Sequence, residues 1–148
     1  MKGFKDIIDK VISIIKETDI IPIDAVYEYR GALMNMPLHD PTVTVGIRDV
    51  TLETGKLRAY GGILNGTAEY SIPADIEICA NIHIPKDVSG IICYNVLSAM
   101  ADGLFYNDEL DVYKITSGKM DYNSTFLCSV LPVSIFIRDR LCGNSVGG

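Results

Sequence analysis

The feature that most constrains the fold is a regular alternation along residues 72–84. In the stretch IPADIEICANIHI every even position is apolar, and the odd positions from 75 to 83 hold Asp75, Glu77, Cys79, Asn81 and His83. A period of two residues places successive side chains on opposite faces of a β-strand. We therefore predict one unusually long strand, with its even positions in a core and its odd positions on a polar face.

Two further segments have helical patterns. In residues 3–17, apolar residues such as Ile7, Val11 and Ile14 recur every three or four positions, which is typical of an amphipathic helix. The segment KDVSGIICYNVLSAMADGLF follows the long strand after Pro85. Its clearly polar positions from 91 to 104 form one narrow stripe, so we predict a largely buried second helix that is closed by Gly103 and the YND sequence.

The remaining segments read as strands and turns. TVTVGIRDVTL changes its phase near Arg48–Asp49, which indicates a bulge or bend, and Asn65–Gly66 is a hairpin signal. The segments ELDVYKIT and STFLCSVLPVSIFIRD follow as two more strands, in which Pro132 indicates a sheet edge or a bulge. The predicted fold class is α+β: a largely antiparallel sheet with two helices on one face and the N-terminal helix first.

Length and composition limit the classes of function. The chain has 148 residues, which fits a single domain over 1–148, with residues 143–148 as a flexible tail. A formal net charge of -6 argues against general nucleic-acid binding, because phosphate contacts need clustered Lys and Arg. No apolar run approaches the ~18–20 residues of a membrane span, and Asp6 and Asp9 interrupt any signal-peptide core. We expect a soluble protein that is intracellular when made.

The Cys79 and His83 pair could suggest a metal or catalytic site, but the strand geometry argues against it. Four residues along a strand separate their Cα atoms by about 13 Å, whereas two ligands of one zinc ion lie within ~2.0–2.3 Å of the metal. The four cysteines lack a zinc-type spacing and stand in apolar surroundings, so we expect free thiols. We predict no catalytic residue, no metal and no cofactor.

The polar face of the long strand is the candidate interaction surface. We assign to it Asp75, Glu77, Asn81 and His83, and we add Tyr60 and Leu64 from the segment that precedes the hairpin signal. The alternative is that this face meets only solvent.

The order of elements resembles a known family, the tail terminator proteins of long-tailed bacteriophages and of phage-derived contractile bacteriocins. The resemblance rests on the helix at 4–17, on PTVTVGIRDVTLETG, and on ADIEICANIHIPKDVSGIICYNVLSAMADGLF. It covers most of residues 3–138 and is a similarity of pattern and of a few residues. The acidic YNDELD and the glycine-rich C-terminus neither strengthen nor weaken it.

The resemblance implies a structural role without catalysis. It implies a hexameric ring of this chain that caps the tail tube, ends tube polymerisation and offers a docking face to the head or neck. The implied partners are further copies of the chain, the tube protein and sheath or neck proteins, with no specific nucleic acid and no membrane. The implied location is the tail end of a virion or a bacteriocin particle, after synthesis in the bacterial cytoplasm. The alternatives are another neck or head–tail joining protein, and a small hot-dog-fold enzyme of the thioesterase type.

Overall fold

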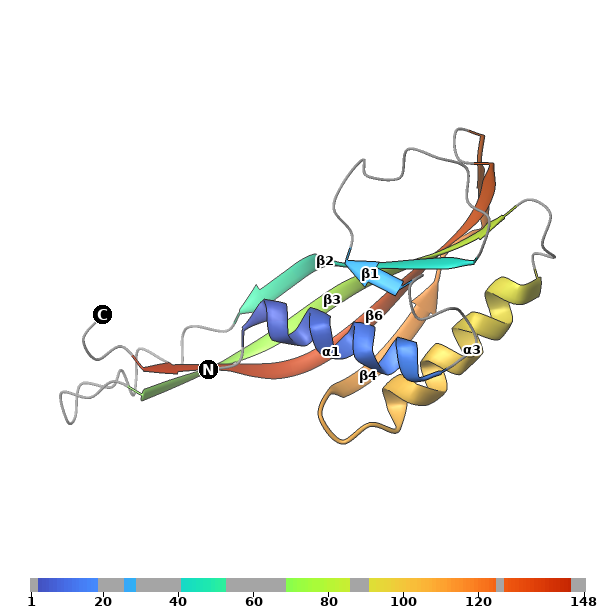
Figure 1. The fold of residues 1–148 in the computed structure, drawn as a ribbon. Helices are drawn as coiled ribbons and strands as arrows, with labels where there is room; N and C mark the ends of the chain where they lie inside the picture. Colours follow the sequence, from blue (N-terminus) through green and yellow to red (C-terminus); the bar gives the residue numbers. More distant parts are fainter. Residues whose placement is uncertain are drawn as a thin grey trace.

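Over the described residues the fold is a largely antiparallel sheet that carries two helices. The computed structural model describes residues 3–18, 26–28, 41–52, 69–85, 91–124 and 127–144. Over these residues the element order is α1 (Phe4–Glu17), β1 (Val26–Glu28), β2 (Thr42–Leu52), β3 (Glu69–Pro85), α3 (Ile91–Phe105), β4 (Asp111–Ser117), β5 (Asp121–Asn123) and β6 (Cys128–Asn144). Both helices lie on one face of the sheet (Figure 1), so the predicted α+β class with the N-terminal helix first is confirmed.

The sheet is organised around its two longest strands. The strand order is β1-β2-β3-β6-β4, and β5 pairs with β6 beyond the end of β4. β3 and β6 each have 17 residues and pair along their whole length, from Glu69 opposite Asn144 to Pro85 opposite Cys128. Of the pairs between described strands, only β1 with β2 is parallel. Figure 1 shows β3 and β6 extending past the helices at one end.

The predicted phase of the long strand is confirmed. The even residues Ala74, Ile76, Ile78, Ala80, Ile82 and Ile84 are all buried. They meet the buried odd residues of β6, for example Ile78 opposite Ile135 and Ile82 opposite Leu131. The predicted bend in β2 is also present, as a register shift between Ile47 and Asp49.

Pro132 is not on an edge strand of the sheet, but the predicted loss of a neighbouring strand is present locally. β6 lies inside the sheet, and Pro132 stands opposite Asn81 of β3. On the other side of β6, β4 pairs as far as Val133 and β5 begins at Val130. The missing N–H of Pro132 therefore falls at the gap between β4 and β5, where it costs no ladder hydrogen bond, while its carbonyl accepts one from the N–H of Gly118 at 2.8 Å.

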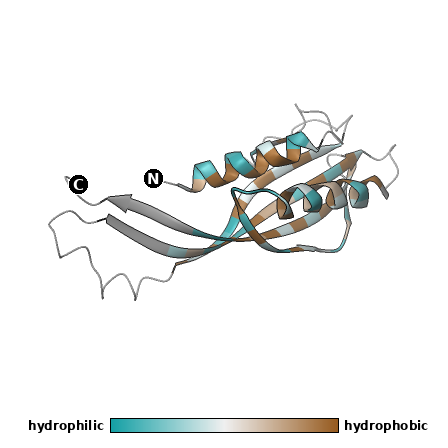
Figure 2. Cartoon of the chain, turned by 90° about the horizontal axis from the view of Figure 1, so that it is seen from below, coloured by the Kyte–Doolittle hydropathy of each residue, from teal (hydrophilic) through white to brown (hydrophobic). Residues whose placement is uncertain are grey.

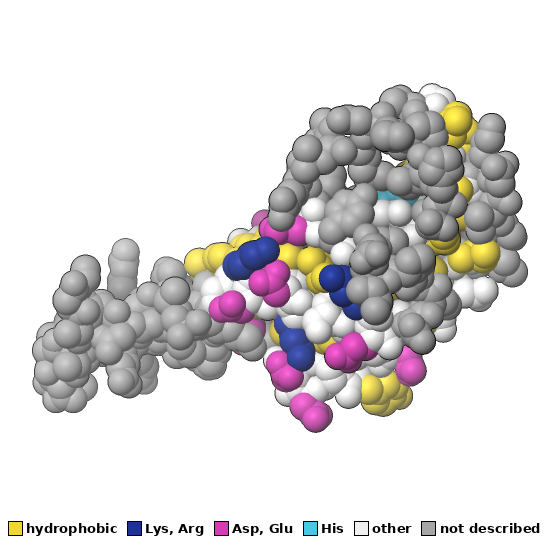
Figure 3. All heavy atoms as spheres, in the orientation of Figure 1, with side chains coloured by type: hydrophobic (Ala, Val, Ile, Leu, Met, Phe, Trp, Pro, Cys, Tyr) yellow, Lys and Arg dark blue, Asp and Glu magenta, His cyan; other side chains and the backbone are white. Residues whose placement is uncertain are grey.

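Helix α1 packs through one apolar side. Its buried residues are Ile7, Ile8, Val11, Ile14 and Ile15. At its start, the N–H of Gly3 donates to Asp6 at 3.1 Å. Figure 2 shows the brown side of α1 against the sheet and the teal side turned to solvent. Figure 3 shows acidic and basic side chains interleaved on the side of the molecule that carries the helices.

Helix α3 is apolar over most of its circumference. Cys93, Val96, Met100 and Leu104 are buried against the sheet. Gly103 does not close the helix as predicted: it lies within it, where a Cβ atom would come 3.2 Å from Ile14 Cγ2 of α1. The helix ends at Phe105 because Asn107 caps it, donating to the carbonyl of Leu104 and accepting from the N–H groups of Glu109 and Leu110.

Some sequence-based expectations lie outside the described residues. These are the hairpin at Asn65–Gly66 and residues 145–148 of the expected tail. The first two residues of that tail, Gly143 and Asn144, belong to β6.

The phase of β3 can be tested by comparing two residues of this strand that point to opposite faces. Ile78 is 0% exposed in the core, and Asp75 lies on the other face with 52% of its side chain exposed. We expect Ile78→Ala to lower the free energy of unfolding by about 2–5 kcal/mol, because it leaves a cavity in the core. We expect Asp75→Ala to lower it by about 1 kcal/mol or less, because Asp75 is at the surface and its ion pair with Arg138 is exposed. Urea unfolding curves measure both, and equal losses would contradict this assignment of the core face.

Candidate interaction surface

The face of the sheet opposite the helices is the candidate site, and we call it the outer face. Because even residues of β3 and odd residues of β6 form the core, the odd residues of β3 and even residues of β6 point the other way. The register places Lys114 of β4 opposite Phe136 and Asp111 opposite Arg138 on this same face. No described helix packs on the outer face.

Two ion pairs link the strands across this face. Arg48 of β2 lies 3.6 Å from the Glu77 carboxylate, which also accepts a hydrogen bond from Ser134 of β6 at 3.0 Å. Arg138 of β6 lies 3.6 Å from the carboxylate of Asp75. Exposed pairs of this kind contribute only about 0–1 kcal/mol each. Their contribution to folding is therefore small beside that of the core.

Aromatic rings and cations meet at the β4–β6 side of the outer face. The guanidinium of Arg138 lies 4.2 Å from the ring centroid of Tyr113, and the Lys114 ammonium lies 5.2 Å from that of Phe136. The two rings are 6.2 Å apart. Tyr113 is the extra residue of a bulge in β4, where the register shifts between Val112 and Lys114. The bulge places a tyrosine and a lysine side by side on a face that strict alternation would give to only one of them.

The other end of the outer face, which we call its closed part, has side chains with little exposure to solvent. Thr42 and Thr44 of β2 are buried, with Thr44 only 2% exposed, and Asn81 and His83 are half-buried. His83 Nε2 lies 3.2 Å from Thr44 Oγ1, and the Cys79 thiol donates to Asn81 at 3.4 Å. The accessible part of the outer face is therefore the part around Asp75, Glu77 and the β4–β6 cluster.

His83 is held in its neutral form. Burial lowers its pKa from 6.5 to about 4. Its Nδ1 atom is buried without a hydrogen-bond partner in the described part of the chain, so a proton placed there would be an unsatisfied buried charge.

The three cysteine side chains that the structure describes lack the environment of reactive thiols. Burial raises the pKa of Cys93 to about 11 and also raises the pKa of Cys79 and of Cys128. A nucleophilic cysteine needs the opposite shift, because the thiolate is the reactive species. Among the described residues, no three His, Cys, Asp or Glu side chains are grouped so as to hold a metal ion.

The structure places the predicted surface residues unequally. Asp75 and Glu77 lie in the accessible part of the outer face, Asn81 and His83 lie in the closed part, and Tyr60 and Leu64 are outside the described residues. Sequence reasoning missed the aromatic and cationic cluster. Phe136 could have been found, since it sits between the core positions Ile135 and Ile137, and the bulge beside Tyr113 could have been found from the change of phase between Val112 and Ile115.

Comparison with known proteins adds no family assignment. No family model matches the sequence, and no curated protein matches it. Neither helix in the described part of the chain has the length and apolar character that crossing a membrane requires.

The shifted pKa of His83 predicts a pH dependence of stability. In the unfolded chain the imidazole takes up its proton near pH 6.5, whereas in the folded chain it does so near pH 4. The unfolded state therefore binds more protons between these values, so stability falls as pH decreases from 6.5 to 4, by at most about 3 kcal/mol.

We expect His83→Gln to reduce this dependence, because glutamine does not titrate and still offers a hydrogen bond to Thr44. Urea unfolding at pH 7, 5.5 and 4.5 measures the difference between the two proteins. Parallel losses in both would show that His83 is not the titrating group.

Proposed function

We propose that the protein is a structural subunit that forms a ring at the end of a phage-type tail tube, ends tube polymerisation and offers a face to the head or neck. The observation that carries the proposal is the order of elements: an amphipathic helix, two strands, a long strand ending at proline, an apolar helix, two short strands and a returning long strand. This is the order on which the resemblance to tail terminator proteins rests.

The outer face supports an assembly role. Tyrosine, phenylalanine and arginine are enriched where proteins bind one another, and Tyr113, Phe136 and Arg138 gather on a sheet face that no described helix covers. A tube end has cyclic symmetry, so a cap that matches it is a closed ring. The proposal includes a hexameric ring of this chain and contacts of that ring with tube, sheath and neck proteins.

The ring can be tested on the free protein and on tubes together. We expect a closed oligomer by light scattering coupled to size-exclusion chromatography, or on tube ends, and shorter, uniform tubes when tube protein polymerises in its presence. Protein that remains monomeric and never decorates tube ends would overturn the proposal. Binding to head or portal complexes without binding to tubes would favour a neck protein instead.

The enzyme alternative has its own readout. The hollow beside α3 is lined by Asn95, Ser98 and Asp102 among others, so it holds a hydroxyl and a carboxylate in one depression. Hydrolysis of acyl thioesters by the wild-type protein, abolished in Asp102→Asn, would favour a thioesterase over a ring subunit.

The accessible outer face should matter for assembly and little for folding. We expect Glu77→Lys to weaken assembly about tenfold or more, because it places a cation beside Arg48 in the proposed contact. The matched control is Asp9→Lys, on the side of α1 that carries Lys5 and faces β1. Both variants should unfold at nearly the wild-type temperature. Equal assembly of the two variants would count against a role for the outer face.

A further inference from the structure

Helix α3 has an uncovered side that its composition does not explain. Asp102 is the only charged residue in its sequence, and a helix that is apolar around its circumference is ordinarily buried. Yet Tyr94, Phe105 and Tyr106 are 50%, 46% and 82% exposed. Tyr94 lies near the start of α3, Phe105 ends the helix and Tyr106 follows it directly. Large exposed aromatic side chains near both ends of a helix indicate a surface that another molecule covers.

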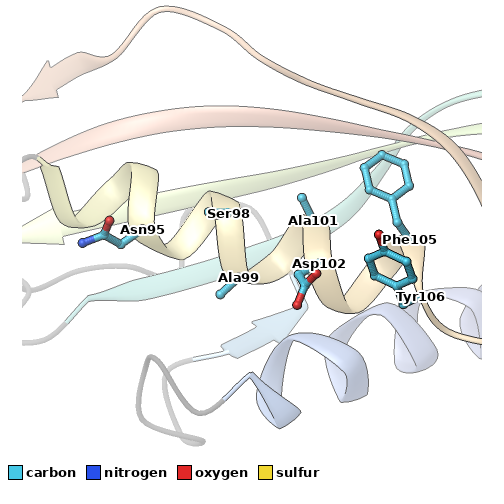
Figure 4. Close-up of a pocket in the computed structure, with 7 residues that line it drawn as sticks. All are labelled: Asn95, Ser98, Ala99, Ala101, Asp102, Phe105 and Tyr106. Atoms are coloured by element: carbon cyan, nitrogen blue, oxygen red, sulfur yellow. The ribbon is translucent and has the colours of Figure 1, made fainter.

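Beside Phe105 and Tyr106 the surface is hollow. An open depression of about 430 Å³ lies along α3, and its walls include Asn95, Ser98, Asp102, Phe105 and Tyr106. Figure 4 shows them in succession along the helix, with the Asp102 carboxylate between the small Ser98 and the two rings. Small residues at the centre and rings at one end leave room for side chains that rise from a partner.

The outer face of the sheet offers complementary chemistry. Arg138 lies beside Asp75 and opposite Asp111, and Arg48 lies beside Glu77, so the charges of both arginines are locally offset. Lys114 is the cation on this face that has no carboxylate partner in the described part of the chain, and it lies over Phe136. Asp102 likewise forms no ion pair with any described residue.

We propose that the α3 side of one subunit docks on the outer face of a second copy of this chain, with Asp102 set against Lys114 and the aromatic residues of both surfaces in contact. This inference rests on the proposed ring, and it identifies the two surfaces that meet between neighbouring subunits. Helices and outer face lie on opposite sides of the sheet, so the contact joins two different surfaces of the same chain. A contact of this kind is head-to-tail, and it generates a closed ring when the rotation between neighbours closes.

Charge exchange tests the contact directly. In Lys114→Glu a carboxylate at position 114 meets Asp102 of the neighbour, and in Asp102→Lys an ammonium at position 102 meets Lys114. Each variant alone should assemble about tenfold or more weakly than wild type. An equimolar mixture should assemble as wild type does, because in an alternating ring every contact again joins one cation to one anion.

Both positions are exposed, so the variants should fold, and their thermal unfolding checks this. Lys119→Glu and Asp9→Lys are the matched controls, and neither they nor their mixture should change assembly. Assembly is measured by light scattering with size-exclusion chromatography and on purified tail tubes.

Three outcomes would overturn the contact: a mixture that fails to recover, a single variant that assembles like wild type, or wild type that stays monomeric in both settings. The last of these also removes the proposed ring. Recovery in the mixture without any capping of tubes would support the contact and refute the tail function alone.

Discussion

The pairing of β3 with β6 is the interaction on which the rest of the structure depends. Seventeen residues of each strand stand opposite one another, and every other described element rests on this pair directly or through one neighbour. The pair also sorts the side chains: one set of alternating positions forms the core beneath α1 and α3, and the other set forms the outer face. Because the side-chain period is two, a slip of one residue would exchange the two faces.

The sequence predicts well where a pattern is repeated and local. The alternation of β3 is maintained over many residues, so its phase and its end at Pro85 could be read directly, and the spacing in α1 gave that helix to within one residue at its start. The sequence predicts poorly where the outcome depends on a distant partner. Pro132 is compatible with an interior strand only because β4 and β5 leave a gap there, and the proline alone does not distinguish such a gap from an outer edge.

The residues of the candidate surface also differ in how far the sequence alone predicts their surroundings. Asp75 and Glu77 follow from the alternation alone, whereas the closed environment of His83 depends on Thr44, which is 39 positions away in the sequence. Gly103 reads locally as a helix terminator, and only the close approach of Ile14 explains why a glycine stands inside α3. Residues that define a surface by contact between distant segments cannot be assigned from a single segment.

The bulge in β4 has a consequence for aggregation. β4 is the outermost strand on its side of the described sheet, and a regular outermost strand offers free N–H and C=O groups to any other extended chain. Here the strand is seven residues long, its ladder is interrupted at Tyr113, and Lys114 follows at once. A short, twisted and charged border resists uncontrolled growth of the sheet from one molecule to the next. The β4 border therefore gives another extended chain only a short and interrupted template on which to add a strand.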